Sequence, residues 1–278
     1  MSSAEPPADR PRGSRLEGKA AVIVGAGQTP GATIGNGRAT ALRFAQEGAH
    51  LLLVDRDDTS VKETEAMILD AGGRAEVVVV DIAGPDGPAE VRSRALEALG
   101  RIDILHHNVG IGAGDNTPTK LTEEAWDRII DVNLRAMWRT CKEIVPIMRA
   151  QNSGAIVCVS SIAAVASAPH LTAYKVSKAG VNALVQSLAM TNARYGIRVN
   201  AIMPGLIETP MAVDAAAQAF NLSRDEVARA RDAMVPLGNK QGTAWDVANA
   251  ALFLASDEAA FITGVCLPVD GGQSAKVG

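Results

Sequence analysis

The segment that decides the fold is Val24-Gly25-Ala26-Gly27-Gln28-Thr29-Pro30-Gly31-Ala32-Thr33-Ile34-Gly35-Asn36-Gly37-Arg38, which joins an apolar run to a helical pattern. Glycines let the backbone approach a pyrophosphate closely, and the free N–H groups and positive dipole end of a helix N-terminus attract it. Glycine also serves ordinary turns, so the interpretation depends on the position between a strand and a helix. In that position, the sequence predicts a nucleotide-phosphate site built on Gly25, Gly27, Gly35, Asn36 and Gly37.

Outward from this segment, short β-branched runs alternate with longer helical patterns. The runs cover residues 20–24, 51–54, 76–80, 102–105, 155–159, 198–203 and 265–269, and the helical patterns cover 37–47, 59–71, 89–99, 122–149, 173–195 and 245–254. Continuous apolar strands separated by helices predict a parallel sheet that is buried on both faces. Right-handed crossovers place the helices on both sides of such a sheet. We therefore expect one doubly wound α/β domain of the Rossmann type with about seven parallel strands.

Composition restricts the class of protein. Of 278 residues, 47% are hydrophobic and 21% are charged, which is typical of a globular protein with a sizeable core. A net charge of −4 and the absence of a basic cluster argue against a nucleic-acid surface. Residues 1–15, rich in Pro, Ser and charge, are expected to form a disordered tail ahead of a single domain, 16–278.

Neither a membrane segment nor a metal site is indicated. No stretch approaches the roughly 18 continuous apolar residues of a spanning helix. The three cysteines are odd in number and lack metal-ligand spacing, and the four histidines form no metal signature. Cys141, Cys158 and Cys266 therefore read as free thiols in a reducing compartment, and we expect a soluble cytoplasmic protein.

An acidic residue ends the second apolar run. Asp55 follows Gly37 by eighteen residues and is placed to accept hydrogen bonds from an adenosine ribose. Its charge would repel a 2′-phosphate, which favours NAD over NADP, although the adjacent Arg56 would offset part of that preference by reaching a phosphate. The alternative is that Asp55 is only a turn residue at a strand end.

A tyrosine and a lysine lie four residues apart on the predicted helix 173–195. Positions i and i+4 share one helix face, so Tyr174 and Lys178 point at the same side. A nearby cation favours the phenolate and lowers the tyrosine pKa from about 10, while a serine such as Ser161 hydrogen-bonds a substrate oxygen. The set suits chemistry at a carbonyl or a secondary alcohol. Such pairs are also common on solvated helix faces, so the interpretation requires a hydride carrier nearby.

These elements together resemble the short-chain dehydrogenase/reductase family across residues 16–274. The matching elements, in chain order, are the glycine loop, Asp81-Ile82, Asn108-Val109-Gly110, Asp131-Val132-Asn133-Leu134, the Ser161/Tyr174/Lys178 set, Arg198-Val199-Asn200, Pro204-Gly205 and Val269-Asp270-Gly271-Gly272. The glycine loop and Asp55 make NAD the expected cofactor, and the resemblance implies a homodimer or, more often, a homotetramer built on the two long helices.

The resemblance also implies roles for individual residues. Tyr174 would be the general acid/base, Ser161 would orient the substrate oxygen, and Lys178 would lower the tyrosine pKa and hold the nicotinamide ribose. Asn133 would hold a water that links the lysine to solvent, unless it only ties a helix kink. Further cofactor contacts are implied for Asp81 and Ile82 along the adenine, residues 108–110 (Asn108 and Gly110 among them) along the adenosine side, Pro204 and Gly205, Ile207 near the carboxamide, and Thr209. Asp81 could instead merely end a strand.

Two departures from the family pattern stand out. Nine residues separate Gly25 from Gly35, where the family has three, and Pro30-Gly31 indicates a turn within the six extra residues. We hypothesise that this longer loop folds over the cofactor or the rim of the site. In the second departure, His107-Asn108-Val109-Gly110 replaces the usual Asn-Asn-Ala-Gly, and we expect His107 to be a hydrogen-bonding residue at a strand end.

The substrate-binding region is predicted at residues 206–236, the family's variable lid, together with the segment before Tyr174. The expected pocket residues are Val165, His170, Leu206 and Met211. This mainly apolar wall favours a medium-sized, largely apolar secondary alcohol or ketone. Two alternatives remain: a 3-oxoacyl thioester reductase using NADPH, which Asp55 counts against, and a nucleotide-sensing protein without turnover.

Overall fold

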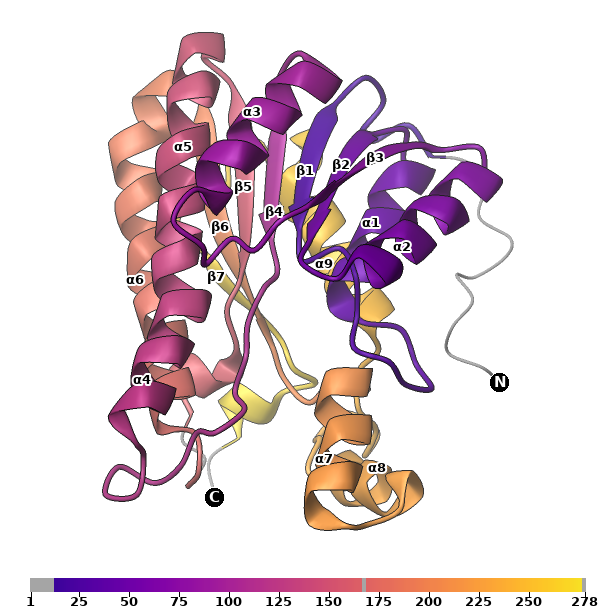
Figure 1. Cartoon of the computed structure of the whole chain (residues 1–278), viewed down its shortest axis with the longest axis vertical. Helices are drawn as coiled ribbons and strands as arrows, with labels where there is room; N and C mark the ends of the chain where they lie inside the picture. The colour runs from indigo at the N-terminus through magenta and orange to yellow at the C-terminus, as the bar shows by residue number, and fades with distance from the viewer. Residues whose placement is uncertain (1–12, 167–168, 277–278) are drawn as a thin grey trace.

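A seven-stranded parallel sheet forms the centre of the molecule in the computed structural model, which describes residues 13–166 and 169–276. The strand order is β3-β2-β1-β4-β5-β6-β7, and every neighbouring pair is parallel. Helices cover both faces (Figure 1), which confirms the predicted doubly wound fold. The strands are β1 (Ala20–Val24), β2 (His50–Asp55), β3 (Arg74–Val79), β4 (Ile104–His107), β5 (Gly154–Val159), β6 (Ile197–Pro204) and β7 (Cys266–Val269).

Alternate residues of the central strands enter two separate cores. Ile23 and Leu53 pack with helices α1, α2 and α9, while Val22 and Leu52 pack with α3, α5 and α6 on the opposite face. Because both faces are covered, the central strands are mostly apolar, and this is why the sequence predicted their positions. The helices are α1 (Asn36–Gln46), α2 (Asp58–Asp70), α3 (Gly87–Leu99), α4 (Glu123–Ile130), α5 (Ala136–Gln151), α6 (Thr172–Asn192), α7 (Ala215–Phe220), α8 (Arg224–Asp232) and α9 (Ala244–Ala255).

The predicted helix 122–149 is interrupted in the structure. Thr122 caps α4 by accepting a hydrogen bond from the Ala125 amide. A π-helical segment, Asp131–Arg135, then separates α4 from α5. Wide turns of this kind bulge the helix backbone and are often found at functional sites. Here the bulge contains Asn133.

The first described residues contact the body of the domain. Residues 1–12 of the predicted tail lie outside the described residues. Residues 13–15, also assigned to the tail, contact the body: the Gly13 amide donates to the Gln46 carbonyl, and the Arg15 guanidinium lies 2.6 Å from the Glu47 carboxylate.

All three cysteines are free, as expected. No described helix is long and apolar enough to cross a membrane.

The predicted lid folds as a small helical unit at the carboxyl ends of the strands. A π-helical turn, Pro210–Asp214, leads into α7, and α8 follows after a short turn. Val213, Ala217 and Val227 form a separate apolar cluster that holds these segments together. In Figure 1, α7 and α8 project from the body next to the loop that precedes α1.

Candidate active site

The glycine loop brings backbone atoms together too closely for side chains. A Cβ on Gly37 would lie 1.8 Å from the Gly25 carbonyl oxygen and 2.8 Å from Asn108 Nδ2. Gly25 itself has φ +83°, a backbone conformation that L side chains rarely adopt. The Asn108 amide donates to the same Gly25 carbonyl at 3.3 Å, so the predicted residues Gly25, Gly37 and Asn108 form one cluster.

The N-terminus of α1 is suited to an anion. Its N-cap residue is Gly35, which has no side chain to cap the helix, and no acidic residue occurs in the first turn. Two buried oxygen atoms beside it, Thr33 Oγ1 and Asn36 Oδ1, have no hydrogen-bond partner among the described residues. Uncapped amides and the positive end of the helix dipole attract a pyrophosphate. These residues therefore fit the phosphates of a dinucleotide.

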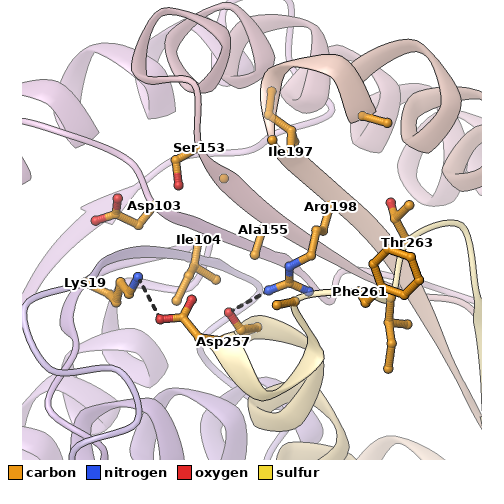
Figure 2. A pocket seen from close by; sticks show the side chains of 16 residues that line it. Lys19, Asp103, Ile104, Ser153, Ala155, Ile197, Arg198, Asp257, Phe261 and Thr263 are labelled. Atoms are coloured by element: carbon orange, nitrogen blue, oxygen red, sulfur yellow. Dashed lines mark hydrogen bonds and ion pairs between the residues drawn. The ribbon is translucent and has the colours of Figure 1, made fainter.

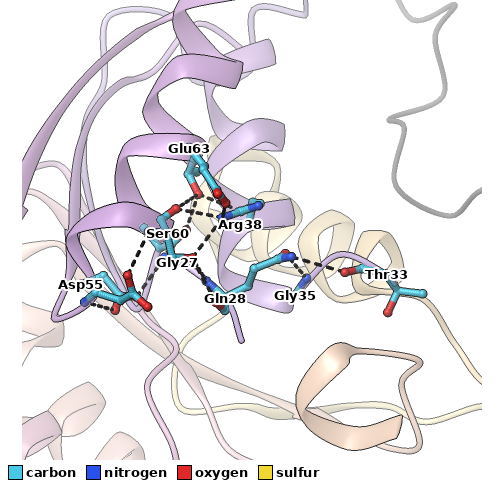
Figure 3. Close-up of polar contacts among 11 residues, drawn as sticks. Gly27, Gln28, Thr33, Gly35, Arg38, Asp55, Ser60 and Glu63 are labelled. Carbon is cyan, nitrogen blue, oxygen red and sulfur yellow. Dashed lines mark hydrogen bonds and ion pairs between the residues drawn. The ribbon is translucent and has the colours of Figure 1, made fainter. Parts of the chain in front are cut away.

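Asp55 lies at the opposite side of the loop (Figure 3), where two backbone amides orient its carboxylate. Its Oδ2 accepts from Gly27 N at 2.9 Å and its Oδ1 accepts from Asp57 N at 3.1 Å. Arg56 is exposed to solvent. The buried guanidinium of Arg38 is held by Ser60, Glu63 and Thr64 under the loop. This arrangement presents an acidic group, with its oxygens held in place, at the end of β2.

Two residues that the sequence interpretation missed brace the lengthened loop. The Gln28 side chain folds back and accepts from Gly35 N at 2.9 Å, and its amide lies 3.4 Å from the Thr33 carbonyl. Ser60 Oγ accepts from Gln28 N at 2.8 Å and donates to the Gln28 carbonyl at 3.0 Å. Figure 3 shows these contacts. No family motif covers the inserted residues, so only the folded loop reveals the brace.

The lengthened loop reaches the lid. A Cβ on Gly31 would come within 2.6 Å of the Pro210 side chain and 2.9 Å of the Asp214 carboxylate, and Ala32 N donates to Asp214 at 3.4 Å. Within the lid, the Arg224 guanidinium forms ion pairs with the carboxylates of Glu208 at 2.6 Å and Asp214 at 3.6 Å. The insertion therefore lies against the first turn of the lid.

Ser161, Tyr174 and Lys178 come together at the carboxyl ends of β5 and β6. Ser161 starts the short helix Ile162–Ala164 and hydrogen-bonds the phenol of Tyr174. Lys178 Nζ lies 5.6 Å from the centroid of the Tyr174 ring and donates to the Val159 carbonyl at 2.9 Å. A serine, a phenol and an ammonium thus face one region, as the helical spacing predicted.

The pKa values of Lys178 and Tyr174 shift in directions that differ in part from those expected from the sequence. Burial lowers the pKa of Lys178 to about 8, because desolvation penalises its ammonium. Desolvation also raises the pKa of Tyr174, and the hydrogen bond from Ser161 opposes that shift. The net direction for the Tyr174 pKa is therefore upward, opposite to the lowering that was expected from Lys178.

Asn133 is fully buried and its side chain is fully engaged. Its Oδ1 accepts from Ile111 N at 2.7 Å, and its Nδ2 donates to the Ile111 carbonyl at 2.9 Å and to Ser177 Oγ at 3.0 Å. Ser177 Oγ in turn donates to the Tyr174 carbonyl at 2.7 Å. The side chain thus ties the segment after β4 to the tyrosine turn.

The end of β4 departs from two expectations. Gly110, expected on the adenosine side, lies beside the lysine: a Cβ there would be 2.9 Å from Lys178 Nζ. Neither ring nitrogen of His107 has a hydrogen-bond partner in another described residue, so the expected hydrogen-bonding role is not seen. His106 packs against Phe44 with ring centroids 6.1 Å apart. Both histidines are fully buried, and desolvation lowers the pKa of each to about 3.

The other predicted cofactor residues occupy the same edge of the sheet. Pro204 ends β6, and Gly205 and Ile207 follow it, with Ile207 bridged to Gly242. Thr209 is buried at the N-cap of the first lid turn. After β3, Asp81 is exposed and accepts from Ala83 N at 2.9 Å, while Ile82 is buried.

The expected pocket residues are mostly open to solvent. Val165 and Met211 are 60% and 52% exposed, and His170 is exposed as well. Leu206 is half-buried, and its amide donates to Gln273 Oε1 at 2.8 Å, so the C-terminal segment also contacts this wall.

A separate cavity of about 530 Å³ opens at the opposite, amino ends of the strands. Figure 2 shows Lys19, Asp103 and Ser153 there, just before β1, β4 and β5. Arg198 in this cavity donates to the carbonyls of Leu254 and Ala255 at the end of α9. In parallel α/β sheets ligands bind at the carboxyl ends of the strands, so this cavity is not the active-site candidate.

The comparisons with known proteins agree with this geometry. Residues 31–274 match the family described as enoyl-(acyl carrier protein) reductase. The chain is 38% identical over 262 residues to the 3-oxoacyl-[acyl-carrier-protein] reductase of Thermotoga maritima. This alignment covers 93% of this chain and 98% of the relative. It is 32% identical over 266 residues to the levodione reductase of Leifsonia aquatica, with coverages of 94% and 96%.

A solved structure supports the same assignment. The carveol dehydrogenase of Mycobacterium avium in complex with NAD superposes with a TM-score of 0.87 at 32% identity, covering 95% of this chain and 100% of that one. Sequence relatives and structural neighbours thus match nearly the whole chain, including the strands and helices that carry Ser161, Tyr174 and Lys178. The chain therefore belongs to the short-chain dehydrogenase/reductase family of oxidoreductases.

Proposed function

We propose that this protein is an NAD-dependent dehydrogenase/reductase for a medium-sized, largely apolar secondary alcohol or ketone. The observation that carries the proposal is the convergence of Ser161, Tyr174 and Lys178 at the strand edge that also holds the glycine loop. A bound nicotinamide would supply the hydride acceptor or donor at its C4 position. The protein residues then have to bind, orient and exchange one proton.

In alcohol oxidation, the Tyr174 phenolate takes the substrate hydroxyl proton; in ketone reduction, the phenol returns it to the forming alkoxide. Ser161 hydrogen-bonds the substrate oxygen as charge develops on it. Lys178, kept buried on the helix face of Tyr174, favours the phenolate electrostatically when the proton leaves. Asn133 contributes by holding residue 111 and the Ser177 hydroxyl in place.

We propose NAD as the preferred cofactor because of Asp55. Its carboxylate is oriented by the amides of Gly27 and Asp57, which leaves oxygen lone pairs for ribose hydroxyls and a negative charge against a 2′-phosphate. The Arg38 guanidinium is bonded to Ser60 and paired with the Glu63 carboxylate below the loop. The structural neighbour from Mycobacterium avium, whose complex contains NAD, points in the same direction.

The substrate class rests on the exposed apolar residues Val165 and Met211 and on the names of two relatives. Levodione and carveol, named in those relatives, are compact alicyclic compounds of the proposed kind. A 3-oxoacyl thioester reductase using NADPH is the second candidate, because the relative from Thermotoga maritima carries that name at 38% identity. Asp55 disfavours the NADPH part of that alternative.

One experiment separates these functions. Absorbance of the reduced nicotinamide is followed with NAD and NADP in parallel, across alicyclic ketones, their alcohols and a 3-oxoacyl thioester. We expect turnover of an alicyclic substrate with NAD, and a loss of several orders of magnitude in Tyr174→Phe with NAD affinity retained. Preferred turnover of the thioester with NADPH supports the second candidate. Binding of NAD without any turnover points to a sensing protein, and full activity of Tyr174→Phe contradicts the mechanism.

We also propose that the protein is a homodimer or homotetramer that uses the layer of α4, α5 and α6. Trp126, Trp138 and Val176 on these three helices are 37%, 47% and 44% exposed, an unusual amount of large apolar surface for one face. Light scattering after size-exclusion chromatography measures the assembly directly. A mass of one chain, or an unchanged oligomer in Trp138→Glu, argues against this interface.

A further inference from the structure

The helix that carries the tyrosine lacks a cap of its own. Its N-cap residue is Leu171, whose side chain cannot accept a hydrogen bond, and the first turn contains no acidic residue. The amides of the first helical residues have no partner within the helix. In α6 these residues are Thr172, Ala173 and Tyr174, so the catalytic candidate occupies the third position of an otherwise uncapped turn.

A carboxylate from another element satisfies all three amides. Asp115 Oδ1 accepts from Thr172 N at 3.1 Å and from Ala173 N at 3.0 Å, and its Oδ2 accepts from Tyr174 N at 2.8 Å. Asp115 is 59 residues before Tyr174, in the segment that follows β4. A second contact reinforces the junction: Thr172 Oγ1 donates to the Asn116 carbonyl at 2.6 Å.

The same segment contacts the tyrosine at two further points. Gly112 lies against the phenol ring, since a Cβ there would be 3.6 Å from Tyr174 Cδ2. Its beginning is held by the two hydrogen bonds between Asn133 and Ile111. Residues 111–116 are therefore anchored at one end by Asn133 and at the other by Asp115, with the tyrosine between the anchors.

We propose that Asp115 is a positioning residue of the active site, which sets the location of the Tyr174 phenol by holding the first turn of α6. This inference rests on the proposed function of Tyr174. A charged acceptor bonded to several amides is stronger than a neutral cap and complements the helix dipole. Without the Asp115 carboxylate, the first turn of α6 loses these three hydrogen bonds and frays. The Tyr174 phenol then moves relative to Ser161 and Lys178. A misplacement near 1 Å can reduce turnover by about 100-fold.

The test compares Asp115→Ala and Asp115→Asn with the parent enzyme in the full-length protein, at saturating NAD and substrate. We expect kcat to fall about 10- to 100-fold in Asp115→Ala, with the Kd for NAD within about threefold, because the dinucleotide loop lies elsewhere. In Asp115→Asn, the side-chain carbonyl oxygen can still accept from the amides of Thr172 and Ala173. The side-chain NH₂ group, however, takes the place of Oδ2, which accepts from the Tyr174 amide. Its kcat should therefore be intermediate.

Ile68→Val on α2 is the matched control, because a buried Ile→Val change and the loss of a helix cap destabilise a protein by similar amounts. It should lower the melting temperature by a similar amount and leave kcat unchanged. The inference is overturned if either folded Asp115 variant retains kcat within twofold of the parent, or if Ile68→Val loses as much kcat. If Asp115→Ala fails to fold, Asp115→Asn alone tests the inference, which is then overturned if this variant retains kcat within twofold of the parent. An inactive parent enzyme contradicts the proposed function, and with it this inference.

Discussion

Replacing Gly37 by alanine is expected to weaken NAD binding, because the added methyl group has no room. Its Cβ would lie 1.8 Å from the Gly25 carbonyl oxygen, whereas real Cβ contacts do not fall below 3.0 Å, so the two groups must separate by the difference of 1.2 Å. Gly25 resists that movement, since its amide donates to the Val54 carbonyl at 2.8 Å and its oxygen accepts from Asn108.

The magnitude follows from these contacts. Overpacking costs about 1–3 kcal/mol, and loss of the Asn108 hydrogen bond adds about 1 kcal/mol. If the displaced loop transmits this cost to the dinucleotide, the Kd for NAD rises by about 30-fold to several hundred-fold, at 1.4 kcal/mol per tenfold. The cost is below the roughly 5–15 kcal/mol of ordinary domain stability, so the variant should still fold.

The assay is titration of the purified variant with NAD by calorimetry, together with its thermal unfolding. Gly35→Ala is the control in the same loop: its Cβ would meet the Gln28 side chain at 3.0 Å, and the nearest backbone atom would be 3.9 Å away. We expect its Kd to change less than tenfold. A folded Gly37→Ala protein whose Kd stays within threefold of the parent would refute the steric reasoning.

Three further predictions concern the loop, the cofactor and pH. Asp55→Ser should raise the NADP to NAD ratio of kcat/KM by tenfold or more, because a carboxylate facing the 2′-phosphate is removed; an unchanged ratio would place cofactor choice elsewhere. Deletion of residues 29–34, which includes the contacts of Gly31 and Ala32 with the lid, should weaken NAD binding about tenfold. Unchanged affinity would exclude a role for the insertion in holding the cofactor. His106 and His107 have folded pKa values of about 3, below the ordinary 6.5, so the folded state binds fewer protons than the unfolded state. Their contribution to stability is complete above pH 6.5 and is lost as pH falls toward 3, by on the order of 2 kcal/mol per histidine between pH 6.5 and 5. Urea unfolding at both pH values should show a smaller loss in His106→Leu than in the parent, and equal losses would contradict the assignment.

The fold could be predicted because burial on both faces makes the central strands mostly apolar. β4 was displaced by two residues in the prediction, since His106 and His107 are polar by type and yet fully buried in the sheet. The interruption at residues 131–135 could not be predicted, because a π-helical turn leaves the apolar pattern of residues 122–149 nearly unchanged.

Of the candidate site, local spacing identified Tyr174 and Lys178, and the strand-loop-helix order identified the glycine loop. The same information placed Gly110 on the adenosine side, whereas the structure places it beside Lys178, and it did not reveal the hydrogen bonds of the Asn133 side chain to Ile111 and Ser177. It also missed Gln28, Ser60 and Asp115. No signal in the sequence pointed to Asp115, because the predicted helix began at residue 173 and only the structure shows that Leu171 is its N-cap residue.

By itself, the sequence determined the alternation of strands and helices, the phosphate loop and the pair of residues on one helix face. Each of these depends on neighbours within a few positions along the chain, where backbone geometry alone sets the spacing. Only the tertiary structure decided that Asp115 caps the helix of Tyr174, that Asn133 holds the segment after β4, and that the inserted loop lies against the lid. Those contacts join residues from 22 to 182 positions apart, and the packing of helices on the sheet alone brings them within hydrogen-bonding distance.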